Sequence, residues 1–201
     1  MIRPVATALF AIAALGVAPA FAQPAEPSDP LPAWRSGPPA DAVMEIGQRF
    51  ECVGPGCPVG LSCLYALGPE RPPGSYPIDI DFIMDDKLMP WSDYEFWLTE
   101  KAKVLRPVLA KDPLVRSDRF AQRSAPLSFT LGEKTLVRRD YVLASKLKAY
   151  SVPAYLWTVK GKLATMFCMT GGQSSKDVRA PIRELLTWLT RESEAPGAKQ
   201  P

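Results

Sequence analysis

Four cysteines are the side chains of this chain with the most defined chemistry: Cys52, Cys57, Cys63 and Cys168. An even number of cysteines in an exported chain favours two disulfides over free thiols, and the N-terminus discussed below indicates export. Four cysteines allow three connectivities, among which the sequence alone does not choose. We favour Cys52–Cys57 with Cys63–Cys168, because residues 53–56 form a glycine- and proline-rich turn that can bring the first pair together. Cys63 is then left to tie the N-terminal segment to a late strand, across a loop of about a hundred residues.

Sulfur ligands for a soft metal ion gather in residues 166–169. Met166, Cys168 and Met169 suit Cu(I), so a copper-handling protein is an alternative function. In a strand, however, Met166 and Cys168 point to one face and Met169 to the other, which favours core packing beside a disulfide. The cysteines lack CxxC spacing and the chain has no histidine, which argues against zinc and thioredoxin-like sites. We therefore expect no bound cofactor.

The absence of histidine also excludes several catalytic mechanisms for this chain alone. Ser-His-Asp and Cys-His mechanisms both need an imidazole. The sequence contains no phosphate-cradling glycine loop and no GxSxG motif. These exclusions favour a protein without catalytic activity and leave carboxylate chemistry as the main route to an enzyme.

The dense acidic cluster of this chain consists of Asp79, Asp81, Asp85 and Asp86. Apolar and acidic residues alternate over 78–84, which predicts a half-buried strand with Asp79 and Asp81 on one face. There they could chelate Ca²⁺ or serve as the paired acid and base of a cell-wall hydrolase. The EF-hand pattern is absent, so the simpler interpretation is that alternating aspartates keep one sheet face in contact with water.

Residues 1–22 have the three regions of a cleaved signal peptide: Arg3, an apolar run over 5–17, and a small-x-small cleavage site over 20–22. The apolar run is too short to span a bilayer, so we expect a periplasmic protein with no membrane insertion after cleavage. The formal net charge is +3 and the basic residues alternate with other types, which argues against a nucleic-acid partner.

Composition divides the rest of the chain into three parts. Residues 23–40 contain six prolines and few core-forming residues, which predicts a disordered linker. Residues 192–201 are polar and contain proline and glycine, which predicts a disordered tail. The stretch between them, 41–191, is long enough for a single domain with its own core.

Hydrophobic periodicity predicts the elements of that domain. Ser92 and Glu95 form a capping box at the start of a helix, which Pro107 ends or kinks. Two antiparallel hairpins and a final helix with an apolar stripe follow, over 127–144, 150–170 and 178–189. The order strand, helix, antiparallel strands, helix predicts an α+β fold in which helices cover an antiparallel sheet.

The second hairpin also predicts a register. A two-residue turn at 160–161 sets Trp157 opposite Ala164 and Pro153 opposite Cys168. Because proline has no N–H to donate, we expect this end of the hairpin at a sheet edge or a bulge.

The region 78–190 resembles the PsbP/DcrB-like fold family. The resemblance lies in a helix opened by residues 92–95, a hairpin turning at 160–161 and a terminal helix around 184–189. It implies an α/β/α sandwich, and members of the family are mostly adaptors, assembly factors and other secreted partner-binding proteins. No catalytic residue is carried over. The expectation is a periplasmic protein-binding domain of adaptor, assembly, inhibitor or immunity type, whose partner is another periplasmic or envelope protein.

Overall fold

The computed structural model describes residues 31–37, 47–69, 72–116, 120–146, 148–170 and 178–192. The expected signal peptide, most of the expected linker and the tail after residue 192 lie outside these described residues.

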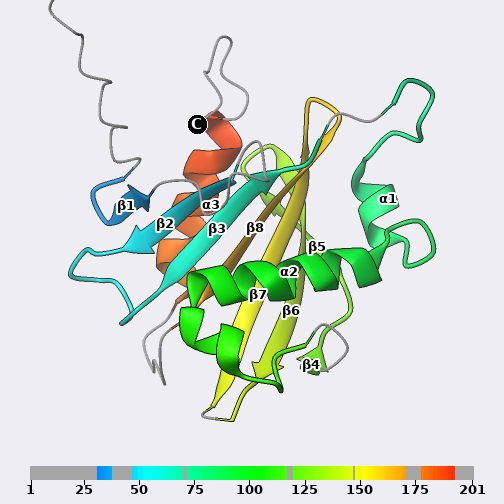
Figure 1. Ribbon diagram of the computed structural model, residues 1–201. Helices are drawn as coiled ribbons and strands as arrows, with labels where there is room; N and C mark the ends of the chain where they lie inside the picture. Colours follow the sequence, from blue (N-terminus) through cyan, green and yellow to red (C-terminus); the bar gives the residue numbers. More distant parts are fainter. Residues whose placement is uncertain are drawn as a thin grey trace, which may run out of the picture.

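Eight antiparallel strands form one sheet in the described part of the chain (Figure 1). Their order across the sheet is β1-β2-β3-β8-β7-β6-β4, and β5 pairs with the other end of β6. The strands are β1 (Trp34–Gly37), β2 (Gly47–Cys52), β3 (Ser62–Leu67), β4 (Phe120–Arg123), β5 (Leu127–Leu131), β6 (Lys134–Ala144), β7 (Ala149–Val159) and β8 (Lys162–Met169).

Helices cover both faces of this sheet (Figure 1). On one face lie α1 (Ile80–Met84), α2 (Trp91–Leu105) and a 3-10 helix, η1 (Pro107–Lys111). On the other face lies α3 (Arg179–Glu192). The predicted α+β class, an antiparallel sheet between helices, is therefore confirmed.

Each face of the sheet has its own core because side chains alternate along every strand. The α2-side core includes Leu98 of α2 and Phe167 of β8, both fully buried. The α3-side core includes Phe50 of β2 and Leu185 of α3, also fully buried. The apolar stripe predicted for the final helix thus packs against the sheet.

Two-residue turns close the two predicted hairpins. Gly132 begins the β5–β6 turn with a φ of 61°, the left-handed value that a type II′ turn requires at that position. In the β7–β8 turn, Lys160 and Gly161 both have positive φ, 49° and 76°, as a type I′ turn requires. Both turn types match the right-handed twist of the flanking strands, so the sequence at the turns helps to set the register.

The β7–β8 register confirms the prediction near the turn and differs from it at the far end. Trp157 lies opposite Ala164 as expected. The β7–β8 ladder ends at the pair Ala154 and Phe167, so Pro153, which has no N–H to extend it, does not pair with Cys168. On the other side of β8, Cys168 lies opposite Cys63 of β3.

Residues 80–84 form the short helix α1, so the predicted strand over 78–84 is wrong. The Asp79 carboxylate accepts a hydrogen bond from the Phe82 backbone N–H at 2.8 Å and caps this helix. In a helix the alternating pattern no longer defines a face, and Ile83 is the residue that becomes fully buried. The local cap has overridden the period-two signal.

The helix α2 begins two residues earlier than predicted, with Pro90 at the N-cap position and no side-chain cap. Ser92 therefore lies inside the first turn, and the predicted capping box with Glu95 does not form. Trp91, the first residue of α2, is buried, and its packing holds the start of the helix against the sheet. Glu95 is buried as well, and its surroundings are described below.

Residues 34–37 form a strand of the sheet, although composition predicted a disordered linker over residues 23–40. Strand β1 pairs with β2, and Trp34 lies opposite Cys52. The Trp34 side chain is only 1% exposed and belongs to the α3-side core. The prediction relied on the high proline content and gave too little weight to Trp34, which packs in that core.

Candidate functional site

The four cysteines form the two disulfides favoured from the sequence. Cys63 and Cys168 are directly opposite on β3 and β8 and are fully buried in the α3-side core. Cys52 and Cys57 close the turn after β2, five positions apart in the sequence. Two disulfides are typical of a protein that works in an oxidising, extracytoplasmic compartment.

The structure does not bring together the sulfur ligands of the copper alternative, Met166, Cys168 and Met169. Cys168 has no free thiol because its sulfur is bonded to Cys63. Met166 lies in the α3-side core and Met169 in the α2-side core, so the sheet separates the two thioethers. Within the described ranges no group of three or more His, Cys, Asp or Glu side chains could hold a metal ion.

The four aspartates do not converge on a shared site either. Asp79, Asp81, Asp85 and Asp86 are all exposed around α1. Asp79 caps the helix, and the Asp85 carboxylate accepts a hydrogen bond from the Lys87 backbone N–H at 2.7 Å. Asp79 and Asp81 do not share a strand face because the strand does not exist. The paired acid and base of the hydrolase hypothesis are therefore not formed by these residues.

Glu95 is a buried carboxylate, and its predicted role in a capping box is wrong. Its Oε2 lies 3.2 Å from Nη2 of Arg123 on β4, and its Oε1 lies 3.9 Å from Nη1 of Arg139 on β6. The Arg139 guanidinium also stacks over the Trp91 ring, 4.3 Å from its centroid. Burial raises the pKa of the Glu95 carboxyl, while the charges of Arg123 and Arg139 lower it in part. This cluster, buried at Glu95 and exposed at Arg123, joins α2 to β4 and β6.

Replacing Glu95 by glutamine is expected to change how stability depends on pH. Because burial holds the pKa of the Glu95 carboxyl above its ordinary value, the folded protein binds this proton more tightly than the unfolded chain. The free energy of unfolding of the wild type should therefore rise relative to Glu95→Gln as pH falls through the folded-state pKa. Urea titrations of both proteins from about pH 4 to about pH 8 measure this difference. A difference that grows as pH rises would contradict the raised pKa.

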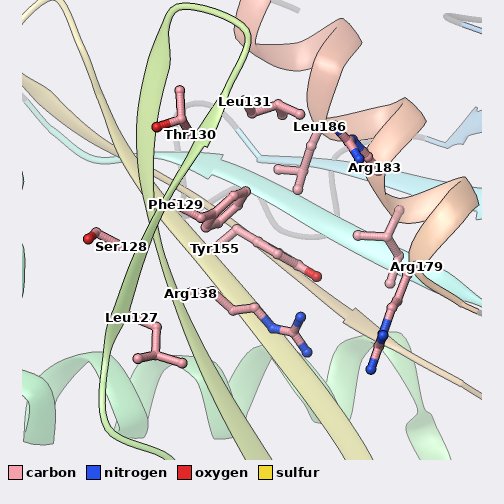
Figure 2. A pocket seen from close by; sticks show the side chains of 11 residues that line it. Leu127, Ser128, Phe129, Thr130, Leu131, Arg138, Tyr155, Arg179, Arg183 and Leu186 are labelled. Carbon is pink, nitrogen blue, oxygen red and sulfur yellow. The ribbon is translucent and has the colours of Figure 1, made fainter.

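An open groove lies between the edge strand β5 and the helix α3 (Figure 2). We call it the β5–α3 groove; its volume is about 510 Å³. Its lining comes from β5, β6, β7 and α3: Leu127, Ser128, Phe129, Thr130, Leu131, Arg138, Tyr155, Arg179, Ile182, Arg183 and Leu186.

The inner part of the β5–α3 groove is apolar and aromatic. Phe129 meets the Tyr155 ring edge to face, with centroids 6.1 Å apart. Leu186 faces these rings from α3 (Figure 2). At the outer end, Leu127 is 62% exposed. The groove therefore offers apolar surface to a ligand without any rearrangement.

Three arginines surround this apolar surface, and none of the described residues that line the groove is acidic. Arg138 donates a hydrogen bond from Nε to Asp140 Oδ1 at 2.9 Å, so its charge is partly balanced. Arg179 and Arg183 are exposed and lie one turn apart on α3. Burial raises the pKa of the Tyr155 hydroxyl, while the charges of Arg138 and Arg179 lower it in part. The groove thus combines apolar contacts with a positive potential.

Two arginines of α3 occupy positions that are unfavourable in a helix. Arg179 is the first residue of the helix, where the helix dipole disfavours a positive charge. Arg183 follows four residues later, and like charges at this spacing repel. Both placements oppose helix stability, and such departures are expected at functional positions. The positions of Arg179 and Arg183 are visible in the sequence, but the sequence does not reveal that β5 faces them.

Comparison with known proteins gives a likeness of architecture only. No family model matches this chain, and no curated protein does. A solved structure of PsbP from the cyanobacterium Synechocystis sp. PCC 6803 (CyanoP) matches 81% of this chain and 81% of its own, with 11% identity and a TM-score of 0.40. The PsbP-like resemblance noted in the sequence is thus found again in the structure. At this identity and TM-score it carries no information on ligands or partners.

Proposed function

We propose that this chain is an exported, non-enzymatic protein-binding domain of the periplasm, and that the β5–α3 groove is its binding site. The occupant is a segment of another periplasmic or envelope protein that carries carboxylates beside apolar side chains. One observation supports this assignment most: three arginines, the exposed Leu127 and the half-buried Phe129 line a groove in which no described lining residue is acidic. Charge complementarity then selects an acidic partner.

The location in the periplasm is supported by the two disulfides and by the signal-peptide pattern of residues 1–22. In the ranges that the structure describes, no helix has the length and apolar character of a membrane span. The domain is proposed to meet its partner in the periplasm, through the groove.

Site-specific photo-crosslinking in living cells tests the proposed function. A photoreactive residue replaces Leu127 at the groove or, as a matched control, Val108, which is 53% exposed on the opposite face of the sheet. We expect a protein adduct of defined mass from position 127 that is absent from position 108. The adduct should also disappear in the Arg183→Glu background. Equal labelling at both positions, or no adduct at either, would contradict a partner in the groove.

Arg183→Glu is expected to weaken binding of the acidic partner without lowering stability. The change removes a groove arginine and replaces the repulsion with Arg179 by an attraction across one helical turn. The free energy of unfolding should therefore rise by about 0.5 kcal/mol or less. Lys111→Glu, an equal change of net charge on exposed η1, serves as the control. Binding that falls equally in both variants would show that only total charge matters.

A further inference from the structure

We infer that the partner segment binds in an extended conformation and adds to the sheet as a further strand along the free edge of β5. This inference rests on the proposed function and specifies the binding mode. The observations that support it are the direction of the β5 backbone groups, the absence of edge protection and the position of the groove beside that edge.

The backbone of β5 has hydrogen-bonding groups directed outward. Among the described strands, β5 pairs with β6 alone. Leu131 and Lys134 flank the two-residue turn and so form a hydrogen-bonded pair. Antiparallel ladders alternate, which places Thr130 and Ser128 at the non-hydrogen-bonded positions. Their N–H and C=O groups therefore point away from β6, and both residues are exposed and line the groove.

The strand β5 itself lacks the residue types with which proteins protect an edge from pairing. Charged residues, prolines and bulges are the usual protection. β1 contains Arg35, and β4 contains Arg123 and a register shift in its pairing with β6. The sequence of β5, LSFTL, contains no charge and no proline. Of these three edge strands, β5 is the one suited to accept another strand.

The groove lies where the side chains of an added strand would point. Alternate side chains of such a strand project to the same face as Phe129, beneath α3. There they lie beside Leu127 and Phe129, and Arg179 and Arg183 of α3 lie across the groove from these two residues (Figure 2). The backbone edge thus provides affinity, and the groove selects a segment in which the inward side chains are apolar and acidic.

A synthetic peptide tests this inference with the purified protein. The probe has about eight residues, in which threonine alternates with phenylalanine and glutamate. One control peptide has lysine in place of glutamate, and another has the same sequence with alternate backbone amides methylated. We expect the probe to bind in fluorescence anisotropy titrations, and each control peptide to bind about tenfold more weakly.

A substitution in β5 tests the same backbone hydrogen bonds through the protein and not the peptide. Ser128→Pro removes an N–H that points away from β6, and an edge strand tolerates proline there. Ser128→Ala keeps the N–H and is the matched control. We expect about tenfold weaker peptide binding for Ser128→Pro and unchanged binding for Ser128→Ala. If Ser128→Pro does not fold, as judged by circular dichroism, the methylated peptide still tests the same hydrogen bonds.

The outcomes separate this inference from the proposed function. If the methylated peptide or a folded Ser128→Pro protein binds as tightly as the parent pair, strand addition is wrong while a groove-bound partner stands. If no peptide binds but position 127 still crosslinks, strand addition by an acidic segment is also wrong. If neither occurs, both proposals fail. Light scattering that shows a dimer broken by Ser128→Pro would identify a second copy of the chain as the occupant and overturn an acidic partner.

Discussion

Replacing Cys63 and Cys168 together by alanine is expected to lower the free energy of unfolding by about 4 to 5 kcal/mol. The disulfide links positions 105 residues apart, so its loss frees a long loop in the unfolded chain. Both cysteines are fully buried between β3 and β8, and the variant also loses core packing there. Urea denaturation of the two proteins, followed by tryptophan fluorescence, measures the change.

The second disulfide provides the control for this prediction. Cys52 and Cys57 are only five positions apart, so the same relation between loop length and entropy gives about 2 kcal/mol for the double alanine variant. If removing the short-range disulfide destabilised the protein as much as removing the long-range one, loop closure would not explain the stability.

Trp34→Ala is expected to lower the free energy of unfolding by about 3 to 5 kcal/mol, because truncating a large buried aromatic side chain leaves a cavity in the core. Trp34 is 1% exposed and packs in the α3-side core, although the sequence around it resembles a linker. The exposed neighbour Arg35 serves as the control, because Arg35→Ala should change the free energy of unfolding by less than about 0.5 kcal/mol. Equal effects of the two substitutions would show that residues 31–37 do not belong to the folded domain.

Local sequence signals predicted the fold where they agreed with tertiary packing. The hairpin at 160–161 was predictable because turn residues and alternation favour one register, and Trp157 does lie opposite Ala164. The pairing of Cys63 with Cys168 followed from the turn-forming residues between the other two cysteines. The apolar stripe of the final helix became the part of α3 that faces the sheet.

The predictions failed where one contact outweighed a pattern. Asp79 caps a helix turn, and this single hydrogen bond converts a predicted strand into α1. Glu95 has the spacing of a capping residue but is paired with Arg123 across the fold, at a distance that local sequence does not describe. Trp34 lies in a proline-rich stretch and still enters the core.

The candidate site could not be predicted from sequence because it exists between distant elements. Phe129 and Arg183 are more than fifty positions apart, and neither belongs to a motif. They line one groove only because α3 lies on the sheet face toward which the Phe129 side chain points. The residues with recognisable chemistry, the cysteines and the aspartates, have structural or solvated positions instead.

Amide hydrogen exchange with and without the acidic peptide tests the central claim most directly. The amides of Ser128 and Thr130 point away from β6, whereas those of Phe129 and Leu131 already pair within the hairpin. We predict that a saturating peptide slows exchange at Ser128 and Thr130 and shifts the resonances of Arg183. Saturation with unchanged exchange at both outward amides, and with shifts confined to residues outside the β5–α3 groove, would contradict the account.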